Sequence, residues 1–148
     1  MREIEAIIHC AQVCRLACAD NGVPYIVPLC FGYETGTLYF HVAREGRKLD
    51  ILRKNPRVCF ECDIDQELVR GQTACQWGMK YRSVIGFGAA SILENPDAKK
   101  AALDRIMKHY NAQQPYAYSD ASLANTLVIK VDIDEMTGKV AGYAIETE

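Results

Sequence analysis

The sequence predicts an α+β fold in which five or six antiparallel strands form a small barrel with two or three flanking helices. Three observations lead to this class: short segments of alternating polar and apolar residues, intervening segments with helical apolar spacing, and a tight hairpin signal at Asn21-Gly22. With 148 residues, 49% hydrophobic and 24% charged, the chain has the size and balance of one globular domain. We expect residues 1–148 to form that single domain.

The N-terminal segment has the apolar spacing of a helix. Its stripe is Ile4, Ile7 and Ile8, and the hairpin that follows requires a strand before it. We therefore expect the helix to end near Ala11 or Gln12.

Two later segments also predict helices. Residues 46–55 form the first of them, which Pro56 stops. The second begins at Asn95-Pro96-Asp97, with asparagine as the cap, proline in the first helical position and an acid in the first turn.

The predicted strands alternate between these helices. In chain order they are a strand from Val13 to the turn at Asn21, Val23–Tyr33, Thr37–Ala43, Arg57–Asp63, Tyr81–Ile92, and a closing hairpin of Leu127–Ile133 and Val140–Ile145 around Thr137-Gly138. Residues 65–73 and 111–125 are polar and are expected to be loops. Pro24 and Pro28 cannot donate to a ladder, so the second strand is expected at a sheet edge or at a bulge.

Charge and composition limit the partners. The formal net charge of −2 creates no global field that favours nucleic acid or an anionic membrane, so a bound anion must be recognised locally. His9, Gln12 and Arg15 interrupt the apolar residues of the first twenty positions, unlike a secretory signal or a membrane span. We expect a cytoplasmic protein without nucleic-acid or membrane partners.

Seven cysteines raise the question of a metal site. Cys10, Cys14 and Cys18 are spaced by four and would align on a helix. Cys59 and Cys62 form a C-x-x-C in a predicted strand, where a spacing of three points the two sulfurs to opposite faces. Free thiols in the core are therefore favoured over zinc binding.

The clearest candidate for chemistry is the start of the helix at residues 46–55. Arg47 and Lys48 lie in its first turn, where the helix dipole is already positive and each cation is unfavourable by roughly 0.3–1 kcal/mol. A bound phosphate would reverse that sign, and Gly46 would let the backbone approach it closely. The alternative is a solvated basic turn that Glu45 and Asp50 partly neutralise, and local physics leaves both open.

Three further features have both a functional and a structural interpretation. Gly86 and Gly88 share one strand face and could accept a flat ring, although plain sheet packing is favoured. A strand interrupted at Pro28 would free backbone groups for the polar edge of a heterocycle. His41 precedes the phosphate candidate, but a lone histidine is more often a satisfied structural residue.

Signatures of hydrolysis and phosphoryl transfer are missing from the sequence. It contains no catalytic triad motif, no paired-carboxylate pattern and no Walker loop. Redox chemistry would therefore need a cofactor.

Taken together, several motifs resemble the pyridoxamine phosphate oxidase-like FMN-binding split barrels, over nearly the whole chain and in matching order. The motifs are Gly22-x-Pro24-Tyr25-x-Val27-Pro28-Leu29, Leu38-Tyr39-Phe40-His41, Gly46-Arg47-Lys48-Leu49-Asp50 and Asn55-Pro56-Arg57-Val58. Tyr81-Arg82-Ser83-Val84-Ile85-Gly86-x-Gly88 is similar to the branch of Nim-type nitroimidazole resistance proteins. The resemblance implies an antiparallel split β-barrel with flanking helices, and a homodimer with two FMN sites at its interface.

The resemblance also assigns eight residues to the FMN site. They are Arg47 and Lys48 at the phosphate, Val27, Pro28 and Leu29 along the isoalloxazine ring, His41 and Val42 beside the ribityl chain, and Ser83, which stands where the oxidases carry a glutamine. No residue is assigned a catalytic role.

The implied activity is that of an FMN-dependent oxidoreductase that passes electrons to a nitroimidazole or another small acceptor. The C-terminal sequence Ile145-Glu146-Thr147-Glu148 lacks the tryptophan and arginine pattern with which the true oxidases end, which argues against pyridoxamine phosphate as substrate. Two alternatives remain open: a flavin- or haem-binding protein without turnover, with His41 as the axial candidate for haem, and a regulatory dimer whose cofactor site is vestigial.

Overall fold

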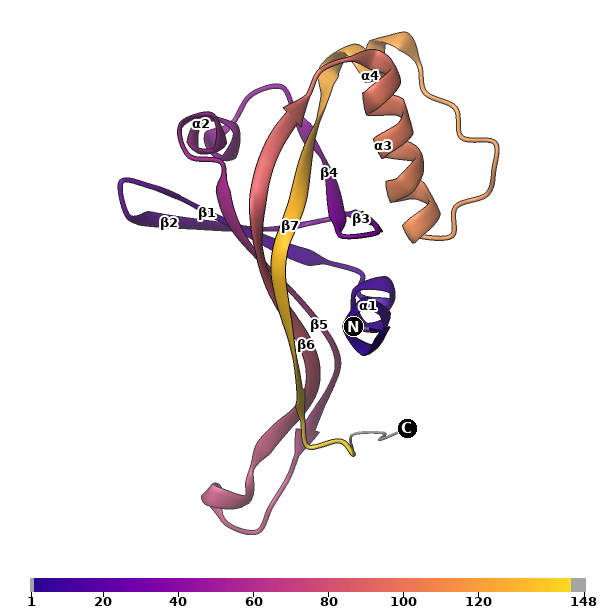
Figure 1. The fold of residues 1–148 in the computed structure, drawn as a ribbon. Helices are drawn as coiled ribbons and strands as arrows, with labels where there is room; N and C mark the ends of the chain where they lie inside the picture. The colour runs from indigo at the N-terminus through magenta and orange to yellow at the C-terminus, as the bar shows by residue number, and fades with distance from the viewer. Residues whose placement is uncertain (1, 145–148) are drawn as a thin grey trace.

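The computed structural model describes residues 2–144 and shows a coiled seven-stranded antiparallel sheet with helices around it (Figure 1). The elements are α1 (Arg2–Cys10), β1 (Cys14–Asp20), β2 (Val23–Leu29), β3 (Gly32–Glu34), β4 (Thr37–Ala43), α2 (Arg47–Lys54), β5 (Arg57–Val69), η1 (Ala74–Gln76), β6 (Gly78–Leu93), α3 (Pro96–His109), α4 (Asp120–Asn125) and β7 (Thr126–Ala141). The strand order is β2-β1-β5-β6-β7-β4-β3. The predicted α+β class is confirmed.

The β1–β2 hairpin forms where the sequence predicts it. Asn21 and Gly22 have φ angles of 50° and 79°, as a type I′ turn requires. β2 is the outermost strand of its side of the sheet, which confirms the edge position expected from Pro24 and Pro28.

The expected strand Val23–Tyr33 is two strands at opposite edges of the sheet. Between them, Phe31 leaves the ladder: its side chain is fully buried, and its N–H donates to the Tyr110 hydroxyl at 3.1 Å. Gly32 then passes so close to α3 that a Cβ there would lie 2.7 Å from the Ile106 nitrogen. The prediction of one long strand was wrong. The chain turns into the core at Phe31, crosses the barrel and begins β3 at the opposite edge of the sheet.

The prediction of a closing hairpin around Thr137-Gly138 was also wrong. β7 continues as one strand through Thr137 and Gly138, which pair with Ile85 and Val84 of β6. Gly138 allows close approach instead of a turn, since a Cβ there would lie 3.1 Å from the side chain of Ile4. Position 145, the last of that predicted strand, lies outside the described residues.

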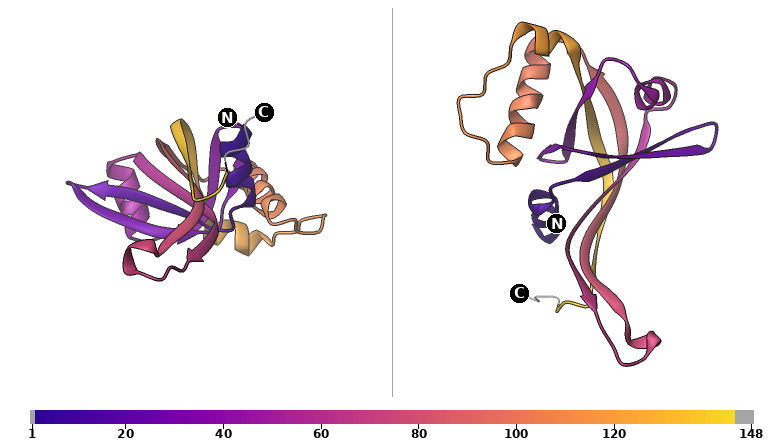
Figure 2. Two further views of the ribbon diagram at one scale, coloured as in Figure 1. Left: turned by 90° about the horizontal axis from the view of Figure 1, so that it is seen from below. Right: turned by 180° about the vertical axis from the view of Figure 1, so that it is seen from behind.

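Both expected loops contain regular structure. β5 passes a bulge near Asp65, whose φ is 58°, and continues to Val69 opposite Gly78. The resulting β5–β6 ribbon projects beyond the rest of the sheet (Figures 1 and 2). In the second loop, Ser119 caps the short helix α4 by accepting a hydrogen bond from the Ser122 N–H.

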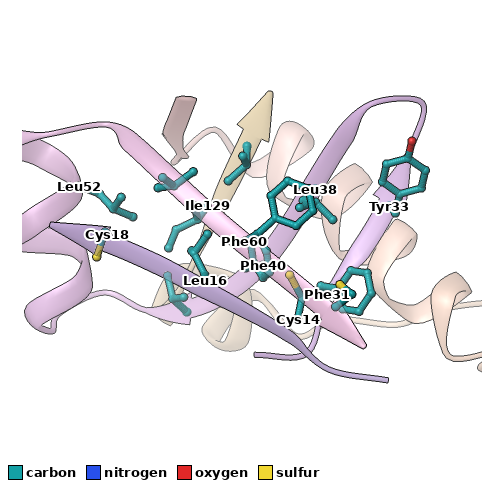
Figure 3. Close-up of a cluster of buried hydrophobic side chains, with 14 of the residues drawn as sticks. Cys14, Leu16, Cys18, Phe31, Tyr33, Leu38, Phe40, Leu52, Phe60 and Ile129 are labelled. Atoms are coloured by element: carbon teal, nitrogen blue, oxygen red, sulfur yellow. The ribbon is translucent and has the colours of Figure 1, made fainter. Parts of the chain in front are cut away.

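The main core fills the inside of the coiled sheet. Figure 3 shows Phe31, Phe40 and Phe60 packed there with Leu16 and Cys14. A second, smaller cluster lies on the outer face, where α3 covers β4 and β7; its buried members are Tyr39, Ala102, Ile106 and Val128.

The glycine pair on β6 belongs to this core. A Cβ at Gly86 would overlap the Phe60 ring, and one at Gly88 would overlap the carbonyl oxygen of Asp132. The sheet-packing interpretation is therefore confirmed, because the Phe60 ring already fills the space beside Gly86.

The cysteines are distributed between helix and sheet. Cys14 and Cys18 belong to β1 and Cys10 ends α1, so the three do not share a helix. Cys62 is fully buried on the inner face of β5, and Cys59 is half-buried on the outer face, as their spacing predicts. Within residues 2–144, no three His, Cys, Asp or Glu side chains form a metal-binding group. In the same range, no helix is long and apolar enough to cross a membrane.

Candidate functional site

The start of α2 is an open helix terminus with two cations. Gly46 caps it with φ 142° and no side-chain cap, and its carbonyl accepts hydrogen bonds from the Leu49 and Asp50 N–H groups at 3.0 and 3.2 Å. The N–H groups of Arg47 and Lys48 have no acceptor within residues 2–144. A helix start with free N–H groups binds anions readily.

Neither cation of this turn is neutralised by the described part of the chain. Asp50 lies 3.9 Å from Arg53, in the next turn, and no carboxylate lies within 4.0 Å of Arg47 or Lys48 among residues 2–144. The alternative of a turn neutralised by Glu45 and Asp50 is thereby weakened. The structure leaves two positive charges and a positive helix end facing solvent together.

An aromatic ring holds one of these cations in place. The Arg47 guanidinium lies 4.9 Å from the ring centroid of Tyr25, a half-buried residue of β2. Tyr25 is in turn the cross-strand partner of Cys18. Burial raises the pKa of the Cys18 thiol, and the nearby charges of Arg47 and Lys48 oppose the rise. Both cations therefore lie against the β1–β2 hairpin.

β2 has a free backbone edge next to the cluster of Arg47, Lys48, Tyr25 and Cys18. It pairs with β1 on one side and has no strand on the other. Val27 and Leu29 are half-buried on the same face as Tyr25, and Pro28 is exposed on the opposite face. The outward backbone groups of this edge are available to the polar rim of a bound molecule.

β4 lies in the other half of the sheet, and residues 44–46 connect it to α2 (Figure 1). Val42 is buried in the core, whereas His41 is exposed on the outer face, opposite Val128. The strand ends at Ala43, which is four residues before Arg47 and five before Lys48. Of the eight predicted site residues, Arg47 and Lys48 thus lie in the cationic turn itself. His41 and Val42 lie on the strand that leads into this turn, and Val27, Pro28 and Leu29 lie on the strand whose Tyr25 contacts Arg47.

Ser83 is the exception. It is buried at 8% exposure in the middle of β6, between its cross-strand partners Asp63 and Lys139. In the sheet, β5 and β1 separate β6 from β2, and β7 separates it from β4. Ser83 therefore pairs with neither of the strands that carry the other predicted residues of the sheet.

Two residues of the cluster were not predicted. Tyr25 belongs to the motif Gly22-x-Pro24-Tyr25 without an assigned role, and the sequence predicts Cys18 only as a core thiol. The alternation of β2 places Tyr25 on the inner face, but nothing in the sequence shows that the helix start lies over its ring. That contact depends on how α2 folds back onto the β1–β2 hairpin.

A separate cavity of about 490 Å³ lies away from this cluster, between α1, the β3–β4 turn and the end of α3. Its lining includes His9, Tyr33, Arg105 and His109. Burial lowers the pKa of His109, whose Nε2 lies 2.8 Å from the Ala11 carbonyl oxygen. None of the eight predicted residues lines this cavity.

Comparison with known proteins agrees with the fold and the motifs. Residues 1–140 match the family model described as pyridoxamine 5'-phosphate oxidase. A crystal structure from Bacteroides thetaiotaomicron, provisionally assigned as a 5-nitroimidazole antibiotic resistance protein, is 38% identical with a TM-score of 0.81, over 93% of this chain and 81% of that one. A FAD-binding protein from Mesorhizobium loti is 27% identical with a TM-score of 0.66, over 93% and 91% of the two chains.

A curated relative matches over a shorter stretch. It is an uncharacterised protein of Rhizobium meliloti, 32% identical over 59 residues, and the match spans 40% of this chain and 38% of that relative.

Proposed function

Because the chain belongs to the pyridoxamine 5'-phosphate oxidase family, we propose that it is a flavoprotein that binds FMN with the phosphate at the start of α2. The observation that carries this proposal is the open helix start, where Arg47 and Lys48 lack any carboxylate partner in the described chain. A phosphate monoester satisfies the free N–H groups and both cations at once.

The surrounding residues fit the rest of the cofactor. In this proposal, the free edge of β2 at Val27, Pro28 and Leu29 meets the polar rim of the isoalloxazine ring, and the backbone at His41 and Val42 runs beside the ribityl chain. FAD is the competing flavin, since the similar Mesorhizobium protein binds it. We favour FMN because a terminal phosphate uses two cations and a helix start more fully than a diester does.

The proposed activity is that of an oxidoreductase. A bound flavin supplies electron transfer to a small acceptor, and the chain's own contribution is to hold and orient it: Arg47 and Lys48 fix the phosphate, and β2 fixes the ring edge. The 38% identity to the Bacteroides protein supports a nitroimidazole-type acceptor.

A homodimer is part of the proposal. Ser83 reaches a flavin site only if a second copy brings it there, since two strands separate it from β2 in its own chain. The expected subunit interface therefore includes the outer face of β6.

The phosphate claim is tested by titrating apo-protein with FMN and riboflavin. Losing one charge-assisted contact costs about 1.5–3 kcal/mol, so Lys48→Ala should weaken FMN binding roughly tenfold to a hundredfold and leave riboflavin binding unchanged. Arg53→Ala is the matched control, because it removes a cation from the last turn of the same helix. Equal affinity of the wild type for FMN and riboflavin would contradict the proposal.

The activity is tested separately, by reducing the holo-protein without oxygen and mixing it with a nitroimidazole. We expect flavin reoxidation faster than that of free reduced FMN. A rate no faster than that would favour a binding role without turnover.

A further inference from the structure

Lys99 is a buried cation in the first turn of α3. The residue is only 3% exposed. Burying a charge is costly, and a cation at a helix start also opposes the helix dipole. Among residues 2–144, no carboxylate lies within 4.0 Å of its Nζ atom. Groups other than carboxylates must therefore compensate this charge.

Backbone carbonyls at the end of α4 supply that compensation. Lys99 Nζ donates to the Leu123 carbonyl oxygen and, at 3.0 Å, to the Thr126 carbonyl oxygen. The last carbonyls of a helix have no partner within the helix and carry the negative end of its dipole, so they attract a cation. Lys99 thereby fastens the junction of α4 and β7 to the start of α3.

A second cation reaches the same junction from the end of β4. Arg44 directly follows β4, and its Nη1 donates to the Ala124 carbonyl oxygen at 2.7 Å. Backbone pairing joins the same segments, because Ala43, the last residue of β4, pairs with Thr126, the first residue of β7. Side chains of α3 and of the segment after β4 thus both bind the end of α4.

Arg44 also begins the short connection, residues 44–46, that leads to the candidate phosphate site. Glu45 is exposed and Gly46 has no side chain, so Arg44 is the residue of this connection whose side chain ties it to the rest of the fold. The free N–H groups of Arg47 and Lys48 follow immediately. The conformation of the cationic turn therefore depends on where Arg44 is held.

We propose that Lys99 and Arg44 are positioning residues for the phosphate site: acting through the end of α4, they fix residues 44–46 and hold the cationic turn in its anion-binding conformation. This inference rests on the proposed function, which places the FMN phosphate at this turn. A site that is already ordered binds more tightly, because binding does not have to order it. In this arrangement neither side chain contacts the phosphate itself.

Amide hydrogen exchange in apo-protein tests whether Arg44 holds the turn. The N–H groups of Leu49 and Asp50 donate to the Gly46 carbonyl oxygen and report on the start of α2. In Arg44→Ala, we expect both to exchange roughly twofold to tenfold faster, because the turn opens more often. The Asn55 N–H, bonded at the other end of α2, is the internal reference and should not change.

A matched control removes a different arginine. Arg57→Ala breaks the ion pair of an exposed arginine with Asp134, beyond the far end of α2, and should leave the exchange of Leu49 and Asp50 unchanged. Unchanged exchange of these two groups in Arg44→Ala would overturn the proposal. Equal acceleration at Asn55 would also overturn it, because it would indicate general loosening of the helix.

FMN affinity tests the link through Lys99. Arg44→Ala and Lys99→Met should each weaken FMN binding roughly twofold to tenfold and leave riboflavin binding unchanged. In the Lys99→Met background, where the end of α4 is no longer fastened, adding Arg44→Ala should cost less than twofold more. An equal loss in both backgrounds would show that Arg44 acts by its own charge on the phosphate, and would overturn the proposal.

The two measurements keep this proposal separate from the flavin assignment. If Lys99→Met does not fold, the exchange measurement decides, because it uses Arg44→Ala alone. A wild type that prefers FMN over riboflavin, with unchanged exchange in Arg44→Ala, would contradict only the positioning. Equal affinity of the wild type for both flavins would contradict the phosphate assignment itself, whatever the exchange rates.

Discussion

At the scale of single residues, the candidate site depends on how Arg47 is held. Its guanidinium lies over the Tyr25 ring, so part of the ordering that phosphate binding requires is already present. The sequence predicted both cations from their position in a helix start. It did not predict Tyr25 as their support, because that contact joins segments twenty-two residues apart through the fold.

Tyr25→Leu tests this support. A partly exposed cation–π contact is worth about 0.5–1 kcal/mol, so FMN affinity should fall roughly twofold to fivefold, with riboflavin affinity unchanged. Tyr143→Leu, which removes a ring 4.6 Å from Arg82, is the control away from the site. Equal losses for FMN and riboflavin would show that Tyr25 supports the hairpin and not the phosphate contact.

The half-buried His109 side chain should make the stability of the protein depend on pH. Burial lowers its pKa below 6.5, so the folded state keeps it neutral where the unfolded state already binds a proton. Because the unfolded state then holds more protons, the free energy of unfolding should fall as pH drops below about 6.5.

Urea unfolding at pH 7.5 and 5.5 measures this effect. His109→Gln should lose less stability between the two pH values than the wild type. His41→Gln, at an exposed position, should behave like the wild type. Identical pH dependence in all three proteins would rule out His109 as the cause.

At the scale of elements, local patterns were reliable where they act over a few residues. The Asn21-Gly22 turn, the edge position of β2 and the capped start of α3 at Asn95 follow from such patterns. Predictions failed where a distant segment decides the geometry. Thr137-Gly138 has turn chemistry, yet pairing with β6 and contact with Ile4 keep it in a strand.

The close packing at Gly86 leads to a testable prediction about the stability of the sheet. Alanine there would force its Cβ into the Phe60 ring, and overpacking of this kind costs typically 1–3 kcal/mol. Gly78→Ala is the control, because nothing lies within 4 Å of a Cβ built at that position. We expect Gly86→Ala to lower the free energy of unfolding well beyond the control, and equal values would contradict close packing at this face.

At the scale of the whole molecule, α3 covers the outer face of the sheet at β4 and β7, while Ile26 and Phe87 remain exposed on that face within the described chain. Seven of the predicted site residues lie on β2, β4 and α2, and their role at a flavin stays a prediction. Ser83 could not be placed from one chain. A dimer accounts for the separation, and sedimentation at micromolar concentration should show two chains per particle.

The visible absorption spectrum of freshly purified protein, read together with its mass in solution, tests the central claim most directly. The account predicts flavin bands, one flavin per chain and a dimeric mass. A Soret band would indicate haem in place of flavin. A colourless protein that does not take up added FMN, or a monomer that retains it, would contradict the account.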